Sequence, residues 1–373
     1  MSRRFSAWIG PAACALLLAA CAGGATSTGP RAAPASAPAP AAAAEQPAAA
    51  AVAAPAAPRL ETVKVSVFPS MGHAGTFIGM KRGYFGEEGI EVEEVPYDTS
   101  SQIIPSLSVG QLDIATGGTA AGFFNAIAQG INVRITLDQT SAAPGTMTNG
   151  VLVRRELIDS GRLREPADLR GLRLAFTSKG HSTEMLLDTV LGWGGLTFQD
   201  VETTQLPYPE MNIALANNNL DIAASIDPNL GLAVQEGYGV RWKTWSEVLP
   251  NDQVSVVMFS PSFADSRAET AKRLTRAWLR GVREYESART KGTNREDVIA
   301  IFQEHNILRD RALYDVLPWP AINPNGRPNA AAIAAAQDWF AAHGYVPRKI
   351  DLSQVIDNQF ADYAVAQLGP YQP

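Results

Sequence analysis

The sequence predicts an α/β protein made of two units built on the same plan. Short polar loops at 70–73 and 178–182 each follow an apolar run and precede a helix-like pattern. Leu112-Asp113-Ile114-Ala115 recurs as Leu220-Asp221-Ile222-Ala223 at the same spacing of 108 positions, and Val133-Arg134 recurs as Val240-Arg241 one residue out of step. Matches in this order indicate two joined βαβαβ-like units. Each would carry a polar loop at the carboxyl end of its first strand, where open α/β sheets bind ligands.

The amino terminus has the features of a lipoprotein signal peptide. Arg3 and Arg4 precede an apolar run over 7–20, which is too short to span a bilayer. Leu18-Ala19-Ala20-Cys21 resembles the lipobox of bacterial lipoproteins, whose cysteine is lipidated. We therefore predict a signal peptide over 1–21 and a lipid on Cys21; the alternative is an ordinary signal peptide with a chance cysteine.

The next segment, 22–58, consists almost entirely of Ala, Pro, Gly, Ser and Thr and cannot bury a core. It is expected to be a disordered tether between the membrane and a globular body. Cys14 leaves with the signal peptide, so no thiol remains for a disulfide. A formal net charge of -6, without a basic stripe, argues against nucleic-acid binding.

Apolar runs and helix-like patterns alternate along the first unit. Strands are expected at 63–68, 90–95, 112–115 and 133–137, with helices at 77–83, 101–109 and 123–128. The third strand leads into Thr116-Gly117-Gly118-Thr119, where glycines let backbone N–H groups approach a ligand closely.

The second unit repeats this order and is followed by helices. A strand at 150–153 leaves the first unit. Strands at 172–176, 201–206 and 220–223, with helices at 166–169, 183–191 and 211–216, then follow. The polar segment after the last of these strands is Ser225-Ile226-Asp227-Pro228. An apolar strand at 254–259 is the predicted return crossing, and amphipathic helices are expected at 268–285, 297–306, 329–340 and 352–366.

Several motifs in fixed order resemble one protein family. They are Lys81-Arg82-Gly83-Tyr84-Phe85, Gly89-Ile90-Glu91-Val92, Ala115-Thr116-Gly117-Gly118, Asp168-Leu169-Arg170-Gly171 and the run from Trp339-Phe340 to Asp357. Over residues 62 to 368 the sequence resembles the periplasmic solute-binding proteins of the sulfonate, nitrate and thiamine-precursor group.

This resemblance implies a type II periplasmic-binding-protein fold, with two α/β lobes joined by two hinge strands around a ligand cleft. Lobe 1 would comprise 59–150 and 254–373, and lobe 2 would comprise 151–253. The implied function is capture of a small organic solute and its delivery to an ABC permease in the inner membrane. We expect the solute to be anionic, of a sulfonate, carboxylate or pyrimidine-like kind. The protein would be a monomer without cofactor, held in the periplasm or at the cell surface by its lipid anchor.

The predicted ligand site lies in the cleft between the lobes. One wall would be formed by Ser70, Met71, His73, Gly118 and Thr119, and the other by Ser178, Lys179, His181, Ser182 and Asp227. Serine and glycine suit helix N-termini, where free N–H groups and the helix dipole favour an anion. Met71, Phe77, Phe123 and Tyr208 are candidates for apolar walls, although Phe77 and Phe123 fit a core role better.

The two charged candidates leave alternatives open. Lys179 either anchors an acidic group of the ligand or points into solvent. Asp227 would repel an anion unless it pairs with Lys179 or meets an amine or hydroxyl of the ligand.

The two histidines also leave alternatives open. His73 and His181 lack a third ligand at a metal-type spacing, so they either hydrogen-bond their own loops or contact the solute. An enzyme resembling a thiamine-pyrimidine synthase, using His73 or His181, is an alternative function. No Gly-x-Ser-x-Gly elbow or phosphate-binding P-loop supports enzymatic activity. A ligand-sensing lipoprotein would use the same cleft.

Overall fold

The structure is a computed structural model that describes residues 60–97, 103–143, 146 and 149–372. The predicted signal peptide with Cys21, and the predicted tether over 22–58, lie outside the described residues. Both sheets belong to one compact unit, Ala56–Pro373.

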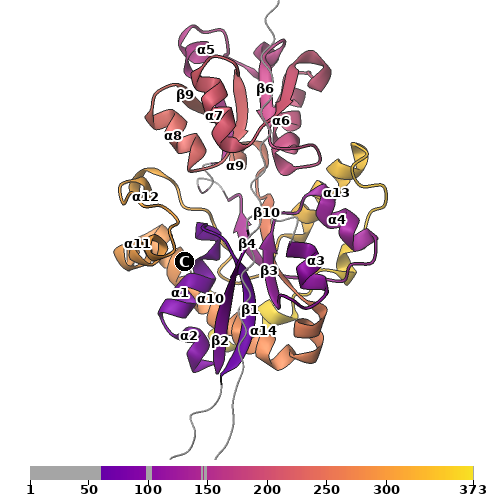
Figure 1. Ribbon diagram of the computed structural model, residues 1–373, viewed down its shortest axis with the longest axis vertical. Coiled ribbons are helices and arrows are strands. Elements are labelled where there is room, and N and C mark those ends of the chain that lie inside the picture. The colour runs from indigo at the N-terminus through magenta and orange to yellow at the C-terminus, as the bar shows by residue number, and fades with distance from the viewer. Residues whose placement is uncertain (1–59, 98–102, 144–145, 147–148, 373) are drawn as a thin grey trace, which may run out of the picture. The chain divides into compact units, whose positions relative to one another are not determined.

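The first sheet has five strands in the order β2-β1-β3-β10-β4 (Figure 1). Strand β1 pairs in parallel with β2 and β3, and β10 runs antiparallel between β3 and β4. The strands are β1 (Glu61–Val67), β2 (Ile90–Pro96), β3 (Ile114–Gly117), β4 (Arg134–Ser141) and β10 (Gln253–Phe259). Valine recurs in β1 and β10, and all four residues of β3 are buried, which suits strands that are covered by helices on both faces.

The second sheet repeats this arrangement in the order β7-β6-β8-β5-β9. Here β5 is the antiparallel strand that lies between β8 and β9, the place that β10 takes in the first sheet. The strands are β5 (Gly150–Arg154), β6 (Arg173–Phe176), β7 (Glu202–Gln205), β8 (Ile222–Ser225) and β9 (Gly239–Thr244). Equal strand order in the two sheets confirms the two units of similar plan.

The repeated aspartates explain part of the internal similarity. Asp113 precedes β3, its N–H donates to the Lys64 carbonyl at 3.0 Å, and its carboxylate accepts from the Lys64 N–H at 3.0 Å. Asp221 precedes β8 and makes the same two bonds to Arg173, also at 3.0 Å each. Each carboxylate thus fixes the register of the first and third strands of its sheet, which is a structural role.

Helices flank both sheets. Those of the first lobe before the crossing are α1 (Ala74–Lys81), α2 (Tyr84–Glu87), α3 (Ile103–Ser108) and α4 (Ala121–Ala128). The second lobe contains α5 (Arg155–Asp159), α6 (Ser182–Trp193), α7 (Tyr208–Ala216), α8 (Asn229–Gln235) and α9 (Trp245–Val248). The chain ends with α10 (Ala268–Lys291), α11 (Arg295–Glu304), α12 (Leu313–Val316), α13 (Ala330–Ala342) and α14 (Gln359–Leu368). Short 3-10 or π turns occur at Met71–His73, Pro166–Leu169, Phe198–Asp200, Ser262–Ser266 and Leu352–Gln354.

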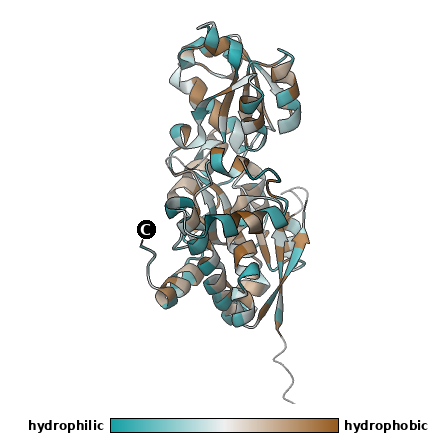
Figure 2. Ribbon diagram, turned by 90° about the vertical axis from the view of Figure 1, so that its left-hand side faces the viewer, coloured by the Kyte–Doolittle hydropathy of each residue, from teal (hydrophilic) through white to brown (hydrophobic). Residues whose placement is uncertain are grey.

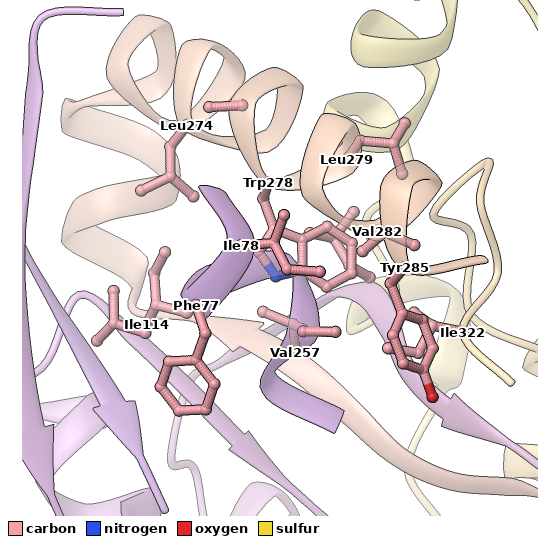
Figure 3. Packing of buried hydrophobic residues seen from close by; sticks show 14 of the residues in the cluster. Phe77, Ile78, Ile114, Val257, Leu274, Trp278, Leu279, Val282, Tyr285 and Ile322 are labelled. Carbon is pink, nitrogen blue, oxygen red and sulfur yellow. The ribbon is translucent and has the colours of Figure 1, made fainter. Parts of the chain in front are cut away.

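Each sheet is covered by apolar side chains on both faces. On one face of the first sheet, α1 and α10 bury Phe77, Ile78, Trp278 and Tyr285 together with Val257 of β10 (Figure 3). A Cβ at Gly75 would lie 2.5 Å from the Trp278 ring, so glycine is needed for α1 and α10 to approach this closely. Hydropathy colouring shows hydrophilic residues on the helices and apolar residues recurring along the strands (Figure 2). The described residues form four apolar clusters, two around each sheet.

The chain crosses between the two sheets twice. The first crossing connects β4 to β5, and the second connects β9 to β10 through α9. The strands predicted as crossings, 150–153 and 254–259, are present and adjoin these crossings, but each is an interior strand of a sheet. The predicted fold of two α/β lobes is confirmed. One predicted helix is wrong: 352–366 is divided into the turn Leu352–Gln354 and α14, because Val355 to Asn358 leave the helix and Ile356 bridges to Ile135 of β4.

Candidate functional site

A cavity of about 410 Å³ lies between the lobes at the carboxyl ends of β1, β3 and β6. The first lobe and its crossings line it with Phe68, Ser70, Tyr97, Ile103, Thr116, Gly117, Gly118, Gln139, Thr140, Val254 and Ser255. The second lobe lines it with His181, Ser182, Thr183, Tyr208, Ile226 and Trp245. This is the cleft position that the sequence predicts, because the first strands of both units end here.

The second-lobe wall is the N-terminus of α6. His181 caps this helix, since its Nδ1 accepts from the Thr183 N–H at 3.4 Å. Burial lowers the pKa of His181, which keeps the imidazole neutral and able to accept this bond. His181 and Ser182 both line the cavity, so hydroxyl and backbone N–H groups meet the positive end of a helix of 12 residues.

The same loop also contains candidates that lie outside the cavity lining. Ser178 and Lys179 are exposed. The Lys179 N–H donates to Gln205 Oε1 at 3.1 Å, which fixes the backbone while the ammonium group stays in solvent. Whether Lys179 anchors a ligand therefore remains a prediction.

In the first-lobe loop, Ser70 faces the cavity and His73 is buried in the core. Ser70 lines the cavity and caps the turn Met71–His73 by accepting from the Gly72 N–H at 3.2 Å. His73 is only 1% exposed, and its Nε2 lies 3.3 Å from the Thr116 hydroxyl. Burial, assisted by the neighbouring charge of His305, lowers the pKa of His73 to about 3. His73 is thus a neutral core residue and is not among the residues that line the cavity.

The end of β3 is arranged as the glycine pair suggests. Gly117 and Gly118 line the cavity, whereas Thr119 is buried and donates to the Gln253 carbonyl at 3.4 Å. A Cβ on Gly118 would lie 3.3 Å from the Val254 carbonyl oxygen, so a side chain would crowd the neighbouring segment. Gly118 allows this close approach, and Thr119 connects the β3 end to the second crossing.

A second cavity of about 330 Å³ adjoins the first through Phe68, Ser70 and Ile226, and contains Met71 and Asp227. Asp227 Oδ1 accepts from the Gly231 N–H at 2.8 Å, while Oδ2 is buried and lies 3.7 Å from Arg241 Nη2. Within the described residues Oδ2 has no hydrogen-bond partner. Burial raises the pKa of Asp227, and Arg241 opposes this effect.

Sequence reasoning missed most of the polar lining of the first lobe. Gln139 and Thr140 at the end of β4, and Ser255 in β10, come from the two segments that adjoin the crossings. Thr140 and Ser255 share a hydrogen bond of 2.5 Å. Gln139 is 2% exposed and its Oε1 has no hydrogen-bond partner among the described residues, although it lines the cavity. Buried polar atoms are nearly always paired, so this oxygen is free for a donor from a ligand.

Aromatic side chains form the remaining walls. Tyr208, which was predicted, lies there together with Phe68, Tyr97 and Trp245, which were not. Burial raises the pKa of Tyr208 to about 12, so its hydroxyl stays protonated. Trp245 Nε1 donates to Asp252 at 2.9 Å, which fixes the indole at the second crossing. Phe77 and Phe123 are core residues, as expected, and are absent from this lining.

Charge is scarce in this cavity. Of the described residues that line it, none is Lys, Arg, Asp or Glu. Over the described part of the chain, no group of three or more His, Cys, Asp or Glu side chains could hold a metal ion. No helix among the described residues is both long and apolar enough to cross a membrane.

Hydrogen bonds between the lobes hold α6 in position. The Gly180 carbonyl accepts from the Ala121 N–H at 3.1 Å, and Tyr345 donates to Glu184 at 2.8 Å. Further along α6, Trp339 Nε1 donates to Asp188 at 2.9 Å. The acidic side chain in the first turn of α6, Glu184, also accepts from the Gly180 N–H at 2.7 Å. Glu184 is absent from the cavity lining, so the helix N-terminus there is not covered by its own carboxylate.

The fold is similar to several solved structures. The periplasmic aliphatic sulphonate binding protein SsuA of Escherichia coli has a TM-score of 0.62 at 23% identity, covering 80% of this chain and 92% of that one. The periplasmic nitrate-binding protein NrtA of Synechocystis PCC 6803 has a TM-score of 0.66 at 15% identity, covering 84% and 90%. A variant of the desulfurization enzyme DSZB with biphenyl-2-sulfinic acid has a TM-score of 0.58 at 15% identity, covering 82% and 99%. At these identities the likeness shows the fold.

Family membership rests on the sequence itself. None of the curated proteins matches the chain significantly. The model of the NMT1-like family matches residues 56–303, which is more than half of the chain and includes both walls of the cavity. The chain therefore belongs to the NMT1-like family and has the two-lobed fold of periplasmic solute-binding proteins.

Proposed function

We propose that this protein is the extracytoplasmic solute-binding component of an ABC importer and captures a small organic solute between its lobes. The interlobe cavity is the observation that carries this proposal, because hydroxyls, an unpaired amide and aromatic rings converge there from both lobes. A site that is divided between two lobes joined by two crossings suits capture by closure and release by opening. The sulfonate- and nitrate-binding proteins that share the fold support this role.

The cavity favours a solute that both accepts and donates hydrogen bonds. A compact acceptor group, such as a sulfonate or carboxylate, fits the N-terminus of α6 beside Ser182 and Thr183. Such an anion would be held by N–H and O–H groups, since the described lining lacks a basic side chain. A donor elsewhere on the solute would satisfy Gln139 Oε1, and a flat ring would pack against Tyr208 and Trp245.

Asp227 extends this chemistry into the second cavity. Its buried Oδ2 could accept a hydrogen bond from an amine or hydroxyl of a solute that reaches past Phe68. Because Arg241 lies 3.7 Å away and already offsets the negative charge, a hydroxyl is the less costly partner. An anion bound at the N-terminus of α6 lies in the first cavity, whereas Asp227 lines the second. This separation reduces the repulsion between the anion and the Asp227 carboxylate.

A thermal-shift screen of sulfonates, carboxylates and pyrimidines tests the proposed solute site. A ligand at one hundred times its Kd adds about 2.7 kcal/mol to the free energy of unfolding. Ser182→Ala should weaken the binding of a hit about tenfold, because a hydrogen bond to a charged group contributes about 1.5 kcal/mol or more. Ser178→Ala is the matched control, since Ser178 lies in the same loop but is exposed. If both variants bind the hit as wild type does, the site at α6 is wrong.

The enzymatic alternative is separable from transport. His181 would have to serve as the reacting base, since His73 is buried away from the cavity lining. Incubating each hit with the protein and following its chemical conversion distinguishes an enzyme from a carrier. Genes for a permease and an ATPase beside the coding gene would favour the importer over both the enzyme and a ligand-sensing lipoprotein.

We also propose that a lipid on Cys21 anchors the protein to a membrane. This rests on the Leu18-Ala19-Ala20-Cys21 sequence, since these residues lie outside the described part. Cys21→Ala should move the protein from the detergent-extracted membrane fraction to the soluble fraction, or leave it unprocessed. Cys14→Ala is the matched control and should partition as wild type does. If both the partitioning and the processing of Cys21→Ala match wild type, the lipoprotein proposal is excluded.

A further inference from the structure

A third cavity, which we call the annex, lies beside the interlobe cavity in the first lobe, with the exposed residues Pro105 and Gly122 at its edge. Its volume is about 300 Å³, and it lies between α3 and α4 at the end of β3. Ile103, Phe123, Ala126 and Met258 contribute apolar walls. Among its described lining residues, the one side chain with a polar atom belongs to Thr116, whose hydroxyl faces His73. The annex is thus an apolar compartment.

The annex is continuous with the interlobe cavity. Four residues line both spaces: Ile103, Thr116, Gly117 and Gly118. The shared wall includes two successive residues without side chains, and a Cβ on Gly117 would meet only Met258 Cε at 3.6 Å. Glycine at this position leaves the passage between the two spaces unfilled.

Helix α4 keeps its annex face small. Gly122 and Ala126 are one turn apart, so they lie on the same face of the helix, and both line the annex. A Cβ on Gly122 would meet no atom within 4 Å, although glycine weakens a helix relative to alanine. Gly122 is exposed and Ala126 is partly buried, so small residues on this face leave the annex open where larger side chains would cover it.

We propose that the annex receives an alkyl or aryl arm of the solute whose polar group is held at α6. The inference rests on the proposed function, and it assigns the solute to a class of amphiphiles with a compact polar head and an apolar arm. Water in an apolar compartment gains little from its walls, so its displacement by carbon favours binding. The interlobe cavity would orient the polar head of the solute, and the annex would select solutes by the length of their apolar arm.

The test uses a series of n-alkanesulfonates, from methanesulfonate to octanesulfonate, titrated calorimetrically into the purified protein. Each methylene that enters the annex should tighten binding about fourfold until the annex is full. Gly122→Leu and Ala126→Leu fill the annex from α4, and both should abolish the gain for longer chains while leaving methanesulfonate binding unchanged. Gly192→Leu is the matched control, because Gly192 is an exposed glycine in α6 whose added Cβ would also meet no atom.

The outcomes separate the annex from the proposed function. Binding that does not tighten with chain length, or a gain that persists in both filled variants, would overturn the annex while leaving a solute site at α6. The proposed solute site at α6 fails on a different result, namely that Ser182→Ala leaves the binding of every solute unchanged.

Discussion

The two polar loops of this protein have related sequences and equivalent places in their sheets, yet their histidines have opposite surroundings. His73 is buried between Phe68 and Phe77, with ring centroids 4.6 and 5.6 Å away. His181 lines the cavity and caps α6. The difference arises from which residue caps the helical segment. Ser70 starts a 3-10 turn that carries His73 into the core, whereas in the second loop the helix starts only after His181. Capping, more than position in a repeat, decides which side chain faces the ligand.

Replacing each histidine by alanine should have its largest effect on the free energy of unfolding. His73→Ala removes a buried ring and should lower the free energy of unfolding by about 3 kcal/mol, by analogy with large-to-small changes in cores. His181→Ala removes an N-cap and should cost about 1 kcal/mol. Urea denaturation of both variants at pH 7.5 measures these losses. Equal losses would mean that the two histidines are equally buried.

Stability as a function of pH sharpens the comparison. The pKa of His73 is about 3 in the folded protein and about 6.5 when unfolded, so the unfolded chain binds the proton first as the pH falls. Wild type should therefore lose up to about 1.4 kcal/mol per pH unit below pH 6.5 through His73. His73→Phe should lack this loss, and its stability relative to wild type should rise as the pH falls. His181→Phe should show a shallower change, because His181 is less buried.

Asp138 is a useful control, because its effect on stability should change with pH in the opposite direction to that of His73. Burial raises the pKa of this β4 carboxyl to about 6, above its unfolded value of 3.8. The folded protein therefore binds this proton first, and the contribution to stability is present below pH 3.8 and is lost as the pH rises through 6. Asp138→Asn should lose stability relative to wild type as the pH falls from 6 to 4. If the curves of Asp138→Asn and His73→Phe run parallel, the assignment whose expected sign is not seen is contradicted.

The smallest expected effect concerns the second residue of each loop. Lys179 is exposed and outside the cavity lining, so Lys179→Ala should weaken an anionic solute at most about threefold at low salt, and less at 0.15 M. Met71 lines the second cavity, so any effect of Met71→Ala should come from lost apolar contact and be independent of salt. A loss of tenfold or more for Lys179→Ala at 0.15 M would favour the lysine as an anchor for the solute, which is one of the two alternatives that the sequence leaves open.

The local pattern of apolar and polar residues was sufficient to predict most strands and the position of the cleft. Val63, Ile90 and Ile114 lie in strands close to the predicted bounds, because short apolar runs between turn residues specify buried strands well. The equal spacing of the aspartates at 113 and 221 predicted the shared plan, and the structure shows that both bind the neighbouring strand.

The site was less predictable because half of it is assembled over long sequence distances. Gln139 and Ser255 come from strands that adjoin different crossings, and no local motif marks either as facing the cleft. His73 was misleading for another reason. Its loop position predicted exposure to ligand as well as a structural role, and only the 3-10 turn decides between them. An unpaired atom such as Gln139 Oε1 is a property of the packed structure and leaves no trace in the sequence.

The order of strands along the chain has a consequence for how the protein folds as the chain emerges. In the second sheet the antiparallel interior strand, β5, is the first to be made, so that sheet is complete once β9 has emerged. In the first sheet the corresponding strand, β10, comes last and must insert between β3 and β4. Until Phe259 has emerged, both of those strands have an unpaired edge, which is prone to pairing with other chains. The second lobe should thus be the first to fold, and the first lobe should set the time over which the emerging chain needs protection from aggregation.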